Sequence, residues 1–103
     1  MNMTSTWRWQ TRFGATRADL EQDGEIVTGS VPGIGRGARK IDIKNGSIKN
    51  GEIYFEIEYG SEDNKTVVVH QGKQTGDSIE GTRKTINADG EENESDWFAR
   101  RAD

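Results

Sequence analysis

The sequence predicts an all-β protein, and two features carry that prediction. Residues 52–59 alternate strictly, so that Ile53, Phe55, Ile57 and Tyr59 share one face of an extended strand while Glu52, Tyr54, Glu56 and Glu58 share the other. The aliphatic residues include nine Ile and five Val but one Leu, and β-branched side chains fit a pleated strand better than a helix. We expect a small antiparallel up-and-down barrel, with a two-sheet sandwich as the alternative.

Short strands joined by tight turns account for most of the chain. We expect strands over residues 6–13, 16–22, 25–31, 39–44, 47–49, 52–59, 65–73, 78–86 and 94–101. Turns are expected at Gly14-Ala15, Asp23-Gly24, Asn45-Gly46 and Asn50-Gly51, where Gly, Asn and Asp tolerate the backbone of tight hairpins. The longest connection is the glycine-rich stretch 32–38. Together these elements form about eight strands in one domain, residues 1–103.

An internal repeat indicates where the sheet bends. Gly24-Glu-Ile-Val-Thr-Gly-Ser30 matches Gly76-Asp-Ser-Ile-Glu-Gly-Thr82. If both copies are extended alike, Val27 and Ile79 point inward, and Gly29 and Gly81 follow on the same face. An inward glycine lets a sheet bend sharply, so two of them favour a sheet that curls into a barrel.

The terminal strands can close such a barrel. The first strand places Trp7 and Trp9 on its core face, and the last strand places Trp97 there. Pairing these two strands would remove both exposed edges of the meander, as in lipocalins and avidin.

Several motifs resemble a small, uncharacterised bacterial β-domain. They are the opening Thr6-Trp-Arg-Trp9, the two copies of the repeat and the closing Asp96-Trp-Phe-Ala-Arg100. The resemblance spans nearly the whole chain and implies a β-domain that is often secreted and sometimes sits beside a sugar-hydrolase domain. It names no catalytic residue. The layout is also loosely similar to that of avidin and the lipocalins.

Composition excludes several kinds of chemistry. The net charge of −4 argues against a general nucleic-acid binder, which needs a basic face to release phosphate counterions. The chain has no cysteine, hence no disulfide, thiolate nucleophile or cysteine-based zinc site, and we expect no metal or cofactor. No apolar run approaches a membrane span, and no signal peptide is recognisable. We expect a cytoplasmic protein at face value, or a secreted or periplasmic one if it is processed.

The barrel interior is the expected ligand site. Its predicted residues are Trp7, Trp9, Phe55, Tyr59, Arg83, Trp97 and Arg101. Arg83 and Arg101 lie in phase with the core, where an arginine is costly without a partner, so one or both could hold an anionic ligand. Alternatively, each guanidinium reaches solvent at a strand end or stacks on a Trp ring. Thr11 and Gln71 are the other polar residues in phase with the predicted core.

Two further features invite a functional interpretation. His70, the one histidine, shares a face with Val68 opposite Val67 and Val69, and we interpret it as an exposed or half-covered strand residue. The glycine-rich connection is the best candidate for a lid over a barrel mouth, with Ile34, Arg36 and Arg39 as its contact residues. A strand rather than a helix follows this connection, which argues against a phosphate-binding loop.

The sequence therefore favours a non-enzymatic binding module for a small polar or acidic molecule, and leaves a homodimer open. One alternative is a filled barrel that serves as a structural, assembly or accessory domain. The other, implied by the resemblance alone, is a carbohydrate-binding or sugar-hydrolase-associated domain. Exposed coplanar aromatic rings would favour carbohydrate binding, and burial of Trp7, Trp9 and Trp97 would count against it.

Overall fold

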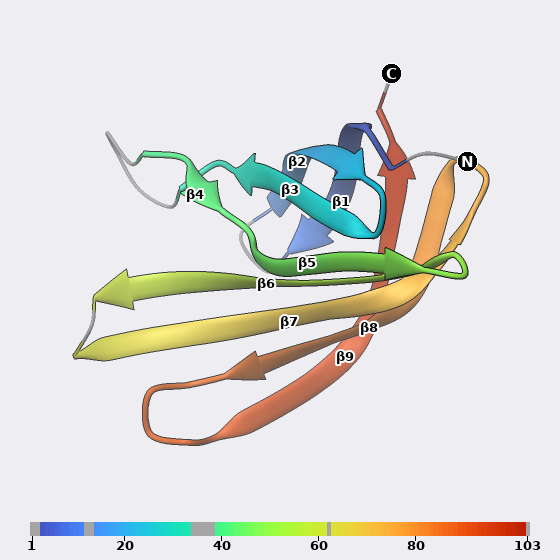
Figure 1. Ribbon diagram of the computed structural model, residues 1–103. Helices are drawn as coiled ribbons and strands as arrows, with labels where there is room; N and C mark the ends of the chain where they lie inside the picture. The colour runs from blue at the N-terminus through green and yellow to red at the C-terminus, as the bar shows by residue number, and fades with distance from the viewer. Residues whose placement is uncertain (1–2, 12–13, 34–38, 62, 103) are drawn as a thin grey trace.

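The computed structural model describes residues 3–11, 14–33, 39–61 and 63–102, of which Thr11 and Ser61 are described in their backbone alone. These residues form nine strands: β1 (Ser5–Thr11), β2 (Gly14–Asp23), β3 (Ile26–Val31), β4 (Ile41–Asp42), β5 (Lys44–Lys49), β6 (Glu52–Ser61), β7 (Asn64–Thr75), β8 (Ser78–Ile86) and β9 (Glu92–Arg101). Figure 1 shows β5 to β9 as a curved sheet, with β1 to β4 lying across it.

The strands form a closed antiparallel barrel, as the sequence predicts. Around the barrel the order is β1, β2, β3, β5, β6, β7, β8 and β9, and β9 pairs again with β1. This makes an eight-stranded up-and-down barrel with β4 as one additional strand beside β3. Because β1 and β9 pair with each other, neither terminal strand is left as a free edge along the residues that they pair.

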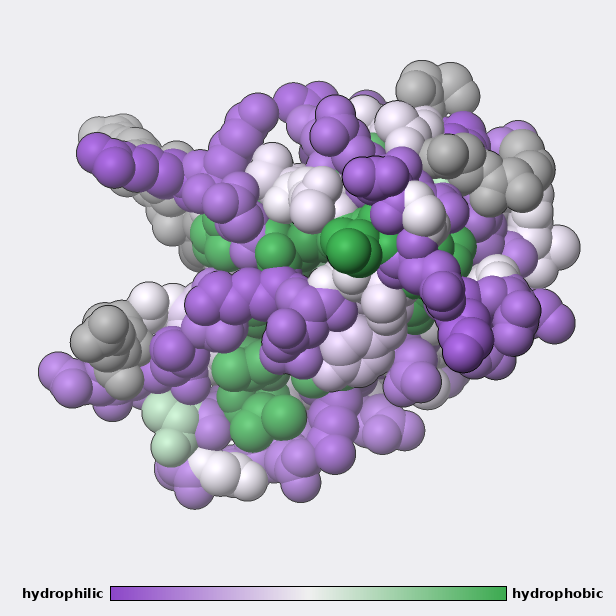
Figure 2. All heavy atoms as spheres, in the orientation of Figure 1, coloured by the Kyte–Doolittle hydropathy of each residue, from purple (hydrophilic) through white to green (hydrophobic). Residues whose placement is uncertain are grey.

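Two seams of this barrel are short. β6 and β7 pair from Glu52↔Lys73 to Ser61↔Asn64, whereas β3 and β5 share only the pair Ile26↔Ser47. β1 and β9 share only Trp7↔Arg101 and Arg8↔Arg100. The barrel thus joins two well-paired blocks, β1 to β3 and β5 to β9. Figure 2 shows a notch between these blocks at the left of the view, with hydrophobic residues on its floor.

The predicted turn at Asn45-Gly46 is wrong. Both residues lie within β5, where Asn45 adopts a φ of 53° and the register with β6 shifts between Lys44 and Ser47. The shift is a β-bulge, which absorbs an extra residue without reversing the chain. β4 and β5 both pair antiparallel with β3, so they run in the same direction rather than as a hairpin.

The predicted turn at Gly14-Ala15 is also wrong. Gly14 and Ala15 already belong to β2, where they pair with Thr11 and Gln10. Residues 12–13, between β1 and β2, lie outside the described part of the chain.

The core occupies the barrel interior and includes Met3, Trp7, Trp9, Ala18, Leu20, Val27, Val31, Ile43, Ile48, Ile53, Phe55, Ile57, Ile79, Trp97 and Ala99. Val27 and Ile79 are buried, which confirms the inward direction predicted from the repeat. A Cβ atom at Gly81 would collide with the carbonyl oxygen of Gln71, so the glycine permits a close approach of β8 to β7 at this position.

The predicted core face of β7 is inverted. Gln71 is exposed, and Val67 and Val69 lie half-buried on the outer face, whereas Val68 and His70 face inward. Register explains this result, because β7 pairs with β6 so that His70 lies opposite the buried Phe55. The interpretation of His70 as an exposed or half-covered residue is therefore wrong, since it is 2% exposed.

Candidate functional site

The seven predicted interior residues divide between two ends of the barrel. We call one the Arg101 end, where the turns β2–β3, β5–β6 and β7–β8 lie, and the other the Arg83 end, where β6–β7 and β8–β9 turn. Trp7 and Arg101 belong to the first end. The other five residues lie toward the Arg83 end: Trp9, Phe55, Tyr59, Arg83 and Trp97.

Arg101 is engaged by the protein itself. Its guanidinium lies 4.6 Å from the centre of the Trp7 ring, and its Nε donates to Asp77 Oδ1 at 2.9 Å. Its Nη1 donates to the backbone oxygen of Thr4, and Trp7 Nε1 donates to that of Met3. This arrangement matches the alternative interpretation, in which a strand-end arginine covers a Trp ring. Arg101 therefore helps to close its end of the barrel.

An aromatic cluster fills the barrel toward the Arg83 end. Trp9, Phe55, His70 and Trp97 each contact the other three, with ring centres between 4.7 and 6.1 Å apart. Three of them were predicted, and His70 was missed. The signal that could have found it is register, because a hairpin turn at residues 61–64 places His70 opposite Phe55.

Two ring nitrogens in this cluster have no hydrogen-bond partner. They are His70 Nδ1 and Trp97 Nε1, both fully covered by protein atoms. Leaving a buried polar atom unpaired costs about 1–3 kcal/mol, and native proteins contain few such atoms. Burial lowers the pKa of His70 to about 3, with the nearby charge of Arg83 as a second cause, so the imidazole is neutral at pH 7.

Arg83 lies beside the cluster on the inner face of β8. It pairs across the sheet with His70 on one side and with Ser95 on the other. Its side chain is half-buried, and its Nη1 donates to the backbone oxygen of Gln10 at 3.1 Å. Within the described part of the chain, no carboxylate lies within ion-pair distance of this guanidinium. Among the described residues, Arg83 is therefore a cation without a carboxylate counter-ion.

On the described inner strand face, the residues around Arg83 are polar and uncharged. Strand alternation places Tyr59, Thr66, Thr85 and Ser95 on the inner face at this end. Burial raises the pKa of Tyr59, and the positive charge of Arg83 partly opposes that shift. The carboxylates of β6 point outward. Lys65 and then Lys44 lower the pKa of Glu58, because each donates to its carboxylate. The negative charge of these strands thus lies on the opposite face from Arg83.

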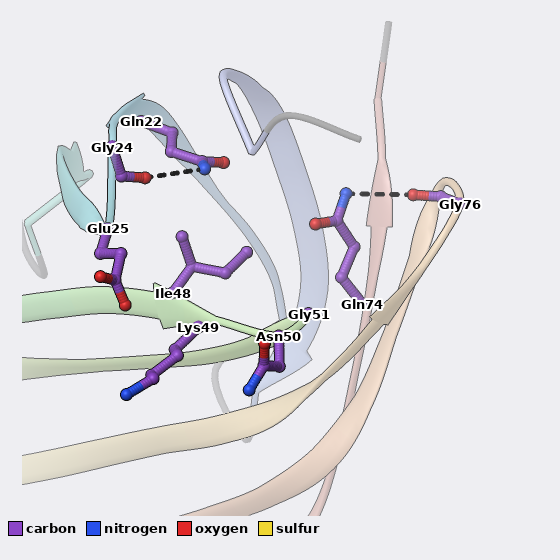
Figure 3. A pocket seen from close by; sticks show the side chains of 9 residues that line it. All are labelled: Gln22, Gly24, Glu25, Ile48, Lys49, Asn50, Gly51, Gln74 and Gly76. Carbon is purple, nitrogen blue, oxygen red and sulfur yellow. Dashed lines mark hydrogen bonds between the residues drawn. The ribbon is translucent and has the colours of Figure 1, made fainter.

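Two surface hollows lie at the two ends. The one at the Arg83 end measures about 470 Å³ and is lined by Asn64, Thr66, Asn87, Ala88 and Asp89. The one at the Arg101 end measures about 560 Å³ and lies between three hairpins. On its walls, Gln22 donates to Gly24 O and Gln74 donates to Gly76 O, so the two copies of the repeat form the same contact (Figure 3). Backbone carbonyl oxygens of the protein therefore already accept hydrogen bonds from these side-chain amides.

Most of the predicted lid lies outside the described residues. Ile34 and Arg36 belong to this part, whereas Arg39 is described and is exposed.

The chain was compared with known protein families, curated proteins and solved structures. No family model, curated protein or solved structure matches the chain. Among the described residues, no helix is long and apolar enough to cross a membrane. In the same residues, no group of three or more His, Asp or Glu side chains could hold a metal ion.

Proposed function

We propose that this protein is a non-enzymatic binding module that holds a small polar or acidic ligand in the barrel at the Arg83 end. The observation that carries the proposal is Arg83, a half-buried residue in phase with the core on β8 whose guanidinium donates to Gln10 O and has no carboxylate partner among the described residues. A half-buried charge is normally paired, because removal from water is expensive. A polar or anionic ligand would supply the missing partner.

The other predicted residues support a site at this end only. Arg101 is held by Trp7, Asp77 and Thr4, so its binding groups are engaged in closing the barrel. Near Arg83, by contrast, two buried ring nitrogens lack partners. The unpaired ring nitrogens, of which the indole N–H of Trp97 is a donor, thus lie at one end of the interior.

A filled barrel with a structural or assembly role is the second candidate. The close packing of Trp9, Phe55, His70 and Trp97 supports it, because these rings leave little room among themselves. A carbohydrate platform has less support. Trp7, Trp9 and Trp97 are all buried, and Phe98 is the exposed aromatic residue, so no pair of exposed rings faces a sugar in the described part of the chain.

Native mass spectrometry of the purified protein, set beside its denatured mass, tests the proposal. We expect an additional mass in the native protein that disappears on denaturation, and we expect Arg83→Leu to lose it. Arg100→Leu is the matched control, because Arg100 is exposed on the neighbouring strand. A bare monomer that also binds nothing from a panel of small polar and acidic compounds would favour the filled barrel, and a bare dimer would favour an assembly role.

A further inference from the structure

We propose that the ligand at the Arg83 end is a singly charged oxyanion, a carboxylate or a phosphate monoanion, held by Arg83 with Trp97 Nε1 and the Tyr59 hydroxyl as further donors. This inference rests on the proposed function and specifies its ligand class. Three observations support it: the charge at the site, the kind of hydrogen-bonding groups there, and the packing of the rings.

Charge selects an anion. The described inner strand face around Arg83 carries the neutral residues Tyr59, Thr66, Thr85 and Ser95, and the carboxylates of β6 lie on the outer face. Asp89, which lines the hollow at this end, accepts a hydrogen bond from the backbone N–H of Glu91 and forms no ion pair with Arg83. A single positive charge is thus uncompensated on the inner face of a protein whose net charge is −4. The planar guanidinium matches the two oxygens of a carboxylate or phosphate, and one positive charge matches one negative charge.

The groups near Arg83 also favour an acceptor-rich ligand. An indole Nε1–H can only donate a hydrogen bond, so the unpaired Trp97 requires an acceptor. Trp97 lies next to Arg83 along the sheet, since the pairs Gly81↔Trp97 and Arg83↔Ser95 are adjacent on the same face. A tyrosine hydroxyl is protonated at neutral pH, and burial raises the pKa of Tyr59 further, so this hydroxyl can donate as well.

Packing limits the size of the ligand and provides a signal of binding. The indole Nε1 of Trp97 is covered by neighbouring atoms, and its ring lies 4.9 Å from that of His70 and 5.6 Å from that of Phe55. A small oxyanion can reach Nε1 only if these rings shift. Binding should therefore change the environment of Trp97 directly.

The three indole N–H groups allow a test with an internal control. We would titrate the uniformly ¹⁵N-labelled protein with acetate, with inorganic phosphate near pH 6, and with glucose as a neutral polar compound. Two-dimensional NMR follows each indole signal, assigned with single Trp→Phe variants. We expect acetate, phosphate or both to move the Trp97 signal, whereas Trp7, bonded to Met3 O, stays in place. The anion that binds more tightly shows whether the site prefers a carboxylate or a phosphate.

Variants connect the signal to the proposed donors. Arg83→Gln should weaken anion binding about tenfold or more, because a hydrogen bond to a charged group is lost. Arg83→Lys should retain part of the affinity, and Arg100→Gln should retain all of it. Tyr59→Phe should weaken binding by several-fold without any change of charge. The unmoved Trp7 signal shows in each variant that the barrel is folded, so loss of affinity is separated from loss of structure.

Failure of the ligand class differs from failure of the proposed function. If glucose moves Trp97 while both anions do not, the oxyanion assignment is wrong and the binding module stands. If Arg83→Gln binds anions as well as the unchanged protein, Arg83 does not hold the ligand, and the proposed function loses the observation that carries it. If no compound moves Trp97 and the purified protein carries no additional mass, both proposals are wrong.

Discussion

His70 stacks on Phe55, with ring centres 4.7 Å apart and planes inclined by 13°. The two residues are cross-strand partners of β7 and β6, so the register of one hairpin places an imidazole in the middle of the core. This contact makes a titratable group part of the packing, and the stability of the barrel therefore depends on pH.

The pKa of His70 predicts acid sensitivity. In the folded protein burial lowers this pKa from 6.5 to about 3, so below pH 6.5 the unfolded chain binds a proton that the folded chain does not bind. Stability should decrease as pH falls through the window from 6.5 to about 3. Between pH 7 and pH 5 the contribution of His70 amounts to about 2 kcal/mol.

Urea unfolding at several pH values measures this effect when the unchanged protein is compared with His70→Phe. Phe occupies a similar space without a nitrogen to protonate, and the difference between the two proteins cancels the carboxylates they share. We expect the variant to be as stable as the unchanged protein, or more stable, at pH 7 and to lose less stability toward pH 5. Parallel pH profiles would show that His70 does not titrate in this way.

Gly46 sets the distance across the short seam between β3 and β5. A Cβ atom there would collide with the carbonyl oxygen of Val27, although the backbone of Gly46 is not in the positive-φ region. Gly46→Ala should lower the free energy of unfolding by about 3 kcal/mol through overpacking. Gly76→Ala is the control, since it has a φ of +63° and open space around it, and should cost about 1 kcal/mol from the backbone alone. If both variants lose the same free energy of unfolding in chemical denaturation, β3 and β5 can move apart at Gly46 without cost and the prediction is wrong.

Arg101 should stabilise the barrel through Trp7 more than through Asp77. The Asp77 side chain is 74% exposed, and exposed ion pairs contribute less than about 1 kcal/mol. The Arg101 side chain is only 14% exposed and lies over the Trp7 ring, where such a contact contributes about 1–2 kcal/mol. We expect Arg101→Met to destabilise the protein measurably and Asp77→Asn to change it by less than about 0.5 kcal/mol. If Asp77→Asn destabilised the protein more than Arg101→Met in thermal or urea unfolding, the ion pair rather than the Trp7 contact would stabilise this end of the barrel.

Both tyrosines should resist ionisation in the folded protein. The Tyr54 hydroxyl donates to Glu56 Oε2 at 2.6 Å, which raises the pKa of Tyr54 to about 12, and burial raises the pKa of Tyr59. Absorbance at 295 nm should therefore show phenolate formation at higher pH in the native protein than in denaturant, where the step lies near pH 10. Glu56→Gln should bring the pKa of Tyr54 back toward 10. A native step at pH 10 that this variant leaves unchanged would contradict the role of Glu56.

Several features of this protein follow from the sequence by itself. The alternation over residues 52–59 predicts β6, and the repeat correctly predicts that Val27 and Ile79 point inward. The three Trp residues lie in the core as predicted. These features are local, because a strand with a clear apolar face specifies its own orientation wherever it pairs.

Tertiary structure alone decided the features that depend on pairing between strands. β7 has Val on both faces, so its own pattern is ambiguous, and its register with Phe55 turned His70 inward and Gln71 outward. Asn45-Gly46 has the composition of a turn, yet pairing with β6 made it a bulge. The sequence also places Arg83 and Arg101 alike in phase with the core. Only the folded barrel separates them, because Asp77 and Trp7 meet Arg101 across strands that are distant in the chain, whereas no described carboxylate meets Arg83.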